Sequence, residues 1–278
     1  MKNKKISIGR ISYINASPLY YGLDNNLVDN FPVWLKMVSD VPSVLNKKIM
    51  NKEIVVSPIS SITYAQNYKE LLILPNLSIS CKGRVLSVIL LSNYSIENLD
   101  SKKVILSNES ATAAGFLKMI CLQKKIFPVF QSGSIKDISK IANTDAVLVI
   151  GDTALKPPWD LNFKYSIDLG SFWFEITKMP FVFALWVVKR SFAKKNPKTI
   201  KTIHNLLLES KNKGYQNIEK IIVKRAKQLG LKQSVIKEYF DLLYCDLDKE
   251  KIRAVDLFFC SLFQMGLLKE KPVLNFFK

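Results

Sequence analysis

Residues 74–92 read LPNLSISCKGRVLSVILLS, and this stretch decides the fold. Polar and apolar residues alternate over 76–80, Lys82 and Gly83 form a turn, and residues 85–91 are almost entirely apolar and β-prone. The run is longer than a typical strand of about five or six residues. A second run of this kind, PFVFALWVV at 180–188, follows later. The two runs predict a chain that crosses from one lobe to another and returns, with the ligand in the cleft between them.

The predicted architecture is an α/β fold of two lobes joined by two crossing strands. At 278 residues the chain is long enough for two moderate hydrophobic cores. We expect lobe I to be discontinuous, formed by residues 1–90 and 186–278, and lobe II to comprise residues 91–185. From Asn196 onward, apolar residues recur at helical spacing in four stripes, which predicts a helical C-terminal segment.

Three short polar loops each follow a predicted strand and precede a predicted helix. They are residues 15–18 after a strand at 5–11, residues 57–61 after a strand at 53–56, and residues 107–112 after a strand at 103–106. In open α/β sheets such loops gather where ligands bind, and helix N-termini with neutral hydroxyls suit carboxylates. Each loop alone is also explained as an ordinary helix cap, with Ser17-Pro18 and Ser57-Pro58 as helix starts. Further along we expect a short helix at 135–141, a buried strand at 145–150 and a turn at 168–170.

Composition excludes several classes of protein. No window approaches the roughly 18 apolar residues of a membrane span, and polar residues interrupt the stretch after the basic MKNKK start, so no signal-peptide core is present. We therefore expect a cytoplasmic protein without a membrane partner. The four cysteines lack CxxC spacing and lie among apolar residues, which indicates reduced, buried thiols and no metal site.

The net charge of +18 raises the question of nucleic-acid binding. Lysines are scattered along the chain, and no helix-turn-helix, zinc-finger or aromatic-ribbon pattern accompanies them. We interpret the charge as a solvated surface, with a general attraction for small anions as the alternative. No nucleic-acid partner is expected.

Conventional catalytic arrangements are missing from the sequence. His204 is the single histidine, it borders an apolar helical stripe, and no Ser-His-Asp or Cys-His relay can be built. No Walker loop or GxGxxG motif is present, so nucleotide cofactors have no support. Any catalysis would rest on hydrogen bonds, positioning and electrostatics.

Six motifs together resemble one enzyme family, the chorismate dehydratases of the futalosine route to menaquinone. They are SYINASPLYYGL (12–23), LPNLSISCKGRVLSV (74–88), SATA (110–113), VLVIGDTAL (147–155), DLGSFW (168–173) and TKMPFVFALWV (177–187). The resemblance implies a type 2 periplasmic-binding-protein fold used as a cytoplasmic hydro-lyase. It also implies conversion of chorismate to 3-[(1-carboxyvinyl)oxy]benzoate and water, without metal or organic cofactor. The alternatives are a non-catalytic binding protein for a small carboxylate and the related 1,4-dihydroxy-6-naphthoate synthase; the sequence carries no signal for oligomeric state.

The resemblance also implies site residues. Asn15 and Ser87 fall on the family's catalytic positions, and the substrate-binding positions fall on Ser60, Ser110, Thr112 and Asp152. The substrate's own enolpyruvyl carboxylate is the expected proton acceptor, with the Asp152 carboxylate as its rival because burial can raise a carboxyl pKa.

The chain departs from the family pattern at three places. Lys178 stands where a glycine is usual, Ala113 replaces a hydroxyl, and residues 51–53 replace a Gly-x-x-Asp turn. The alanine removes one expected carboxylate contact. Lys178 is interpreted as a solvent-facing turn residue, with an added cation near the hinge as the alternative.

Overall fold

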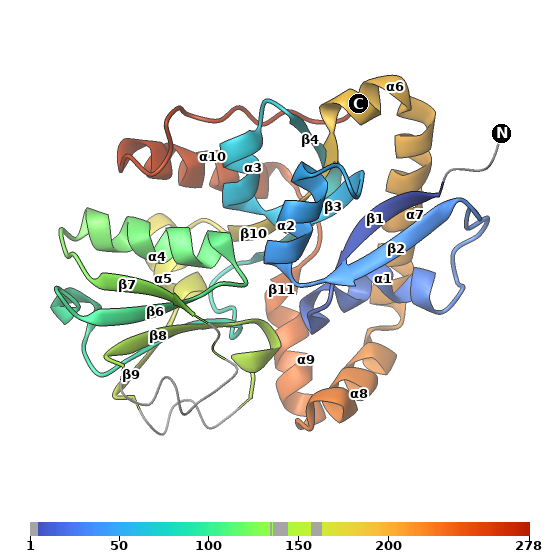
Figure 1. The fold of residues 1–278 in the computed structure, drawn as a ribbon. Coiled ribbons are helices and arrows are strands. Elements are labelled where there is room, and N and C mark those ends of the chain that lie inside the picture. The colour runs from blue at the N-terminus through green and yellow to red at the C-terminus, as the bar shows by residue number, and fades with distance from the viewer. Residues whose placement is uncertain (1–4, 134, 136–143, 157–162) are drawn as a thin grey trace.

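The computed structural model describes residues 5–133, 135, 144–156 and 163–278. Within these residues the strands form two separate sheets with helices packed around them (Figure 1). The larger sheet has the order β11-β4-β10-β3-β1-β2, with β1 (Ile6–Ile11), β2 (Leu35–Asp40), β3 (Val56–Ser60), β4 (Leu71–Cys81), β10 (Phe181–Lys189) and β11 (Leu243–Tyr244). The smaller has the order β7-β6-β8-β5-β9, with β5 (Val88–Ser92), β6 (Lys103–Ser107), β7 (Val129–Gly133), β8 (Ala146–Ile150) and β9 (Tyr165–Asp168). The predicted two-lobed α/β fold is confirmed.

The stretch 74–92 passes from one sheet to the other, as predicted. β4 ends at Cys81 in the larger sheet, and β5 begins at Val88 in the smaller one. The chain returns between Asp168, the last residue of β9, and Phe181, the first residue of β10. The strands therefore change sheet within 82–87 and within 169–180, and the lobe limits given above stay a prediction.

The helices follow the sequence expectations with two corrections. They are α1 (Ser17–Asp24), α2 (Pro42–Met50), α3 (Ser61–Asn67), α4 (Ala111–Gln123), α5 (Leu169–Thr177), α6 (Arg190–Lys195), α7 (Pro197–Gln216), α8 (Ile218–Leu229), α9 (Gln233–Leu242) and α10 (Lys249–Gln264). The turn expected at 168–170 is instead the end of β9 at Asp168 and the start of α5 at Leu169, and the Asp168 side chain caps α5 by accepting from the Ser171 N–H at 3.0 Å. The helix expected at 135–141 lies largely outside the described residues.

The second Ser-Pro pair was wrongly interpreted as a helix start. Ser57 and Pro58 lie inside β3, which is buried throughout, and α3 begins only at Ser61. β1 pairs with β3 only at Val56, so that side of β3 has no strand partner at Pro58, where a strand tolerates a missing N–H. The first Ser-Pro pair does begin α1, but the Ser17 hydroxyl accepts from Arg225 Nε at 2.8 Å and does not cap the helix.

An aromatic cluster joins the two lobes. Phe116 of α4, Trp173 of α5, Phe181 of β10 and Phe258 of α10 pack against one another with ring centroids 4.7–6.0 Å apart. All four are fully buried in the large hydrophobic core. Aromatic pairs of this kind add about 0.5–1.5 kcal/mol each beyond their buried area, so the side of the molecule behind the crossing strands is firmly packed.

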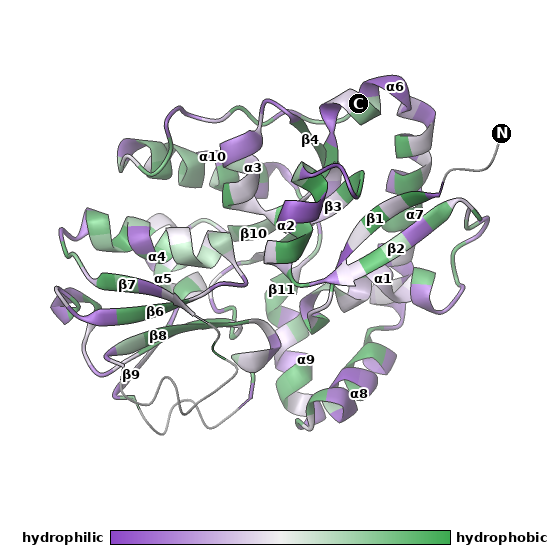
Figure 2. Cartoon of the chain, viewed as in Figure 1, coloured by the Kyte–Doolittle hydropathy of each residue, from purple (hydrophilic) through white to green (hydrophobic). Residues whose placement is uncertain are grey.

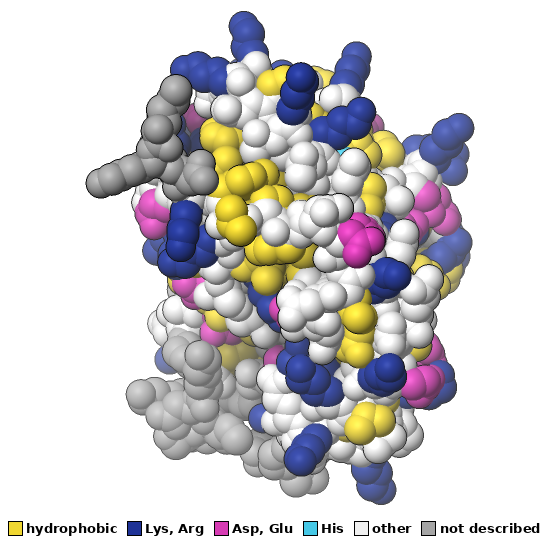
Figure 3. All heavy atoms as spheres, turned by 90° about the vertical axis from the view of Figure 1, so that its right-hand side faces the viewer, with side chains coloured by type: hydrophobic (Ala, Val, Ile, Leu, Met, Phe, Trp, Pro, Cys, Tyr) yellow, Lys and Arg dark blue, Asp and Glu magenta, His cyan; other side chains and the backbone are white. Residues whose placement is uncertain are grey.

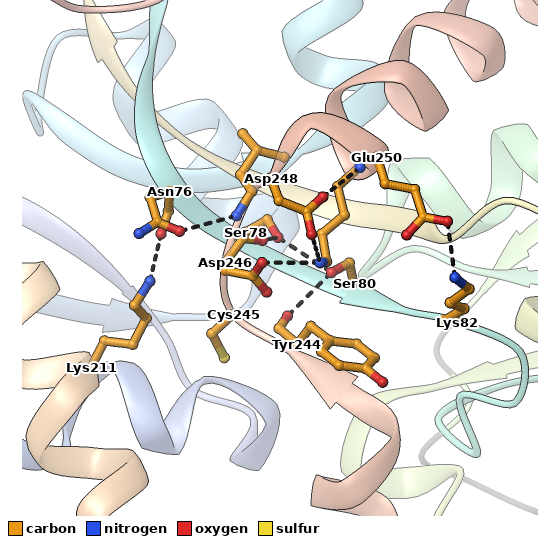
Figure 4. A network of polar contacts seen from close by, with 12 residues as sticks. Asn76, Ser78, Ser80, Lys82, Lys211, Tyr244, Cys245, Asp246, Asp248 and Glu250 are labelled. Atoms are coloured by element: carbon orange, nitrogen blue, oxygen red, sulfur yellow. Dashed lines mark hydrogen bonds and ion pairs between the residues drawn. The ribbon is translucent and has the colours of Figure 1, made fainter.

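The C-terminal segment is helical as predicted, and it is fastened to β4. Lys211 Nζ donates to the Asn76 carbonyl at 2.7 Å, and the almost fully buried Lys251 binds the carboxylates of Asp246 and Asp248 (Figure 4). β11 pairs antiparallel with the end of β4, and Phe276 forms a bridge with Ile73 nearer its start. The tail thus covers the outer edge of β4. In Figure 2 the helix α8 carries both purple and green residues, as the apolar stripe predicted.

The interpretation of the net charge as a solvated surface stays a prediction. On the face shown in Figure 3, Lys and Arg side chains stand apart at many points and form no single patch. Among the described residues no helix is long and apolar enough to cross a membrane. All four cysteines are free; Cys81, Cys121 and Cys245 are buried, whereas Cys260 is partly exposed.

Candidate active site

A cavity lies between the two sheets, at the point where the chain first crosses. Its empty volume is about 530 Å³, including open solvent at its mouth. Asn15, Ser60 and Phe183 line it on the side of the larger sheet, and Ser110 and Gly151 line it on the side of the smaller one. Ser87 lines it from the segment 82–87, where the chain first crosses. None of the described residues that line it is charged.

The Asn15 loop is held by the opposite sheet. Asn15 lies in a short 3-10 helix, Ile14–Ala16, between β1 and α1. Its Oδ1 atom is buried and has no hydrogen-bond partner within the described residues. The neighbouring Ile14 N–H donates to the Asp152 carboxylate at 3.0 Å. Asn15 therefore presents a fixed acceptor in the cavity wall, and an O–H or N–H of a ligand is the natural group to satisfy it.

Asp152 supports this loop from outside the cavity wall. It lies in the 3-10 helix Gly151–Thr153 after β8 and is not among the lining residues. Burial raises the pKa of its carboxyl, while the Ile14 N–H and the charges of Arg225 and Lys156 oppose that rise. The direct contact that the structure gives this carboxylate is with the backbone of the Asn15 loop.

Tyr13 closes the cavity between the lobes. Its ring lies against Gly151, where a Cβ atom would come within 2.8–3.0 Å of ring carbons, and Gly151 has a φ of +64°. Its hydroxyl donates to the Glu109 carboxylate on the loop before α4. Burial, followed by the contact with Glu109, raises the pKa of Tyr13 far above its ordinary value, so the phenol stays protonated and acts as a donor.

Ser87 is placed by Asp168. The carboxylate of Asp168 accepts from the N–H groups of Val85 at 2.9 Å and Leu86 at 2.8 Å, immediately before Ser87, while it also caps α5. Gly170 allows this close approach, because a Cβ atom there would come within 2.5 Å of the Gly83 carbonyl. The DLGSFW motif thus holds the backbone of Val85 and Leu86 in place. Because these residues immediately precede Ser87, they also restrict the position of Ser87.

The remaining hydroxyls divide into two groups. Ser60 and Ser110 line the cavity, and Asn46 holds Ser60 by accepting from its N–H at 3.2 Å and donating to its Oγ at 3.4 Å. Thr112 does not line it: its Oγ1 donates to the Phe183 carbonyl at 3.0 Å and is fully buried. Thr112 therefore ties α4 to β10, and Ala113 beside it is also fully buried.

Four of the six predicted site residues thus line the same cavity, namely Asn15, Ser60, Ser87 and Ser110. The sequence analysis missed Tyr13. The available signal was its place in the same motif as Asn15, two positions before it. It also missed Phe183 and Leu243, whose side chains complete the apolar part of the wall. Leu243 comes from the distant helical segment, and no local pattern indicates that it reaches the cavity.

The cavity can hold an anion without any charged wall residue. The N-terminus of α4 meets it at Ser110, where free N–H groups and the helix dipole favour negative charge. The Ser110 hydroxyl caps α4 by accepting from the Ala113 N–H at 3.3 Å. Within the described residues no cluster of His, Cys, Asp or Glu suitable for a metal ion is found. The groups available for chemistry are hydroxyls, one amide and backbone N–H donors.

Comparison with solved structures shows that the fold is of the periplasmic-binding-protein class. A protein from Archaeoglobus fulgidus superposes with a TM-score of 0.78 at 18% identity, covering 96% of this chain and 100% of that one. The alkanesulfonate-binding protein SsuA from Xanthomonas axonopodis pv. citri gives a TM-score of 0.67 at 12% identity, covering 98% and 96%. A Candida albicans protein described as having the generic periplasmic binding protein fold gives 0.63 at 10% identity, covering 99% and 97%.

Sequence comparison then gives the family. Residues 6–264 match the family described as menaquinone biosynthesis, and the chain belongs to this family. The chorismate dehydratase of Thermus thermophilus is 28% identical over 249 residues, covering 84% of this chain and 86% of that protein. The chorismate dehydratase of Campylobacter jejuni is 32% identical over 199 residues, covering 69% and 74%.

Proposed function

We propose that the protein is a chorismate dehydratase, a hydro-lyase that converts chorismate to 3-[(1-carboxyvinyl)oxy]benzoate and water. Two relatives bear that name, and the family is one of menaquinone biosynthesis. The observation that carries the proposal is the neutral cavity wall in which Asn15 and Ser87 meet Ser60 and Ser110. A cytoplasmic location, independence of nucleic acid and the absence of a cofactor stay predictions.

The reaction breaks the C3–H and C4–O bonds of the substrate ring. The C3 electron pair enters the ring, the C4 oxygen leaves as water with one added proton, and aromatisation drives the elimination. In the proposed arrangement Asn15 Oδ1 accepts a hydrogen bond from the C4 hydroxyl, and Ser87 donates one to the departing oxygen. Such donors are worth most in a site that excludes water. Ser60, Ser110 and the N-terminus of α4 hold the carboxylates.

The proton acceptor is proposed to be the substrate's enolpyruvyl carboxylate. Asp152 has a raised pKa, which suits a base, but its carboxylate is engaged by the Ile14 N–H and lies outside the cavity wall. We propose that Asp152 and Thr112 stabilise the structure around the cavity and do not contact the substrate.

The test is turnover of chorismate by the purified protein, followed by nuclear magnetic resonance of the aromatic product. Ser87→Ala and Asn15→Ala are expected to lower kcat by about 10²–10³-fold, the usual loss for one donor at a developing charge. Ser92→Ala is the matched control, because Ser92 is equally buried at the other end of β5 and does not line the cavity. Wild-type protein that binds chorismate without forming product would favour the second candidate, a binding protein, which the likeness to an alkanesulfonate-binding protein supports.

A further inference from the structure

An arginine from the C-terminal segment reaches the start of α1, beside the Asn15 loop. Arg225 lies in α8, which packs against α1 (Figure 1). Its Nε donates to the Ser17 hydroxyl at 2.8 Å, and its Nη1 donates to the Gln228 side chain on the same helix. Ser17 is only 5% exposed, so its end of the hydrogen bond is shielded from water. The Arg225 guanidinium is thus held in place by two hydrogen bonds.

Ser17 closes the short turn that carries Asn15. The Ser17 N–H donates to the Ile14 carbonyl, so the two residues that flank the Asn15–Ala16 pair bind each other. The Ile14 N–H in turn donates to the Asp152 carboxylate of the other lobe at 3.0 Å. The turn therefore lies between two anchors, an acidic one from the other lobe at its start and a basic one from α8 at its end.

The Asn15 side chain depends on this turn for its position. Its Oδ1 atom is buried and has no hydrogen-bond partner within the described residues, so no described group holds that oxygen directly. The start of α1 also lacks a capping side chain, which is the usual local restraint at such a point. The contact between Arg225 and Ser17 supplies the restraint instead.

We propose that Arg225 is a positioning residue for Asn15. By holding Ser17 it fixes the turn from which the Asn15 amide lines the cavity. Neither Arg225 nor Ser17 is among the described residues that line the cavity, so both act through the turn. The inference rests on the proposed function, because it is there that Asn15 receives its hydrogen bond from the C4 hydroxyl. A different role, a cation that attracts the anionic substrate, would act whether or not Asn15 is present.

Two variants break the contact from opposite sides. Arg225→Gln removes the guanidinium, and Ser17→Ala removes its acceptor without altering α8. We expect each to lower kcat for chorismate about tenfold, the worth of one hydrogen bond to a charged group. KM should change less than about threefold, because the groups assigned to the substrate carboxylates are untouched. If Arg225→Gln does not fold, Ser17→Ala alone carries the test.

Ser210→Ala is the matched control. Ser210 lies in α7, and its Oγ accepts from the Leu23 N–H at 3.0 Å. It therefore also joins α1 to the C-terminal segment, but at the end of α1 that lies away from Asn15. Its loss should lower the urea midpoint and leave kcat unchanged. A fall in kcat as large as that of Ser17→Ala would overturn the inference, since any loosening of α1 would then suffice.

A double-mutant cycle with Asn15→Ala identifies the route of the effect. In the Asn15→Ala protein, adding Arg225→Gln should change the residual kcat less than about twofold. An equal loss with and without Asn15 would overturn the inference and would favour attraction of the substrate by the arginine charge. An unchanged kcat in both Arg225→Gln and Ser17→Ala would overturn it as well.

Amide hydrogen exchange tests the anchor without turnover. Arg225→Gln and Ser17→Ala should each speed exchange of the Ser17 N–H about tenfold, because the turn opens more often, whereas Ser210→Ala should not. If the wild-type protein does not convert chorismate but these variants loosen the turn, the proposed function fails and Arg225 remains the anchor of the Asn15 loop. If the wild type is active and exchange is unchanged in both variants, the inference alone fails.

Discussion

The N–H of Ile14 donates a hydrogen bond to the carboxylate of Asp152 at 3.0 Å, and this contact joins the Asn15 loop of one lobe to β8 of the other. The Asn15 amide, which lines the cavity, is thus positioned from across it. The position of the Asn15 loop therefore depends on how the two lobes sit relative to each other.

Replacement of Asp152 distinguishes a supporting carboxylate from a base. Asp152→Asn keeps an oxygen that can accept from Ile14, so we expect kcat to stay within about tenfold of wild type. Asp152→Ala removes the acceptor and should lower kcat by at least another tenfold. Steady-state kinetics with chorismate measures both. Loss of turnover in Asp152→Asn with chorismate binding kept would instead make Asp152 the proton acceptor.

The pKa of Asp152 also predicts a pH dependence of stability. Because burial raises this pKa in the folded protein above the ordinary value of 3.8, the folded state binds the proton more tightly than the unfolded state. The stabilisation is therefore full below the ordinary pKa and is lost as pH rises through the folded pKa. We expect the free energy of unfolding of wild type, relative to Asp152→Asn, to fall over that window and then level off. Urea titrations of both proteins from pH 3.5 to 7 check this, and a relative stability that rises with pH would contradict it.

Asp168 is predicted to hold both the fold and Ser87. Asp168→Ala leaves the N–H groups of Val85, Leu86 and Ser171 without their acceptor, which should cost about 2–4 kcal/mol. The comparison is Asp248→Ala, another helix-capping aspartate, with an expected cost of about 1 kcal/mol for its cap and a further cost from its ion pair with the buried Lys251, which keeps Asp246 as a partner. Urea unfolding measures the difference. Only the Asp168 variant should also lose turnover, and equal stability losses would show that its contacts with the crossing segment contribute little.

Gly151 and Gly230 form a matched pair for testing the contact with Tyr13. Both have left-handed backbone, with φ of +64° and +69°, but a Cβ atom meets the Tyr13 ring at the first position and nothing within 4 Å at the second. Gly230→Ala should cost about 1 kcal/mol of stability from backbone strain alone. Gly151→Ala should cost about 1–3 kcal/mol more from the clash, and it should impair turnover because Tyr13 is displaced. Equal costs in thermal unfolding would remove the ring contact as a determinant.

Lys178 is predicted to be a strained residue whose replacement stabilises the protein. It ends α5 with a φ of +56°, the conformation that favours glycine, and it is exposed. Lys178→Gly should raise the free energy of unfolding by about 0.5–1 kcal/mol. Lys178→Ala removes the charge but keeps the Cβ atom, so it should give no such gain. A comparable gain in both variants would place the cost in the lysine charge.

The strand-loop-helix pattern predicted where the site lies because it determines which strand ends and loops meet between the sheets. It could not fix which side chains face inward. Ser110 and Thr112 stand two positions apart at the start of α4, and residues at that spacing point to different sides of a helix. Ser110 therefore lines the cavity while Thr112 faces β10.

Other features depended on contacts between distant parts of the chain. Ser57-Pro58 has the local pattern of a helix start, but pairing with β10 keeps it in a strand. Leu243 lines the cavity from β11, at the end of α9, and its helical spacing indicates core alone. The glycine usual in the family at position 178 suits a left-handed backbone, and the sequence alone does not show that Lys178 adopts this conformation.

The tail that covers the outer edge of β4 has a consequence for synthesis of the protein. On the ribosome, β4 emerges long before β11 and Phe276, so its unpaired backbone groups await partners from the last part of the chain. Open strand edges readily recruit other chains. Polypeptides that terminate early should therefore aggregate, and a cell making this protein would depend on chaperones until translation is complete.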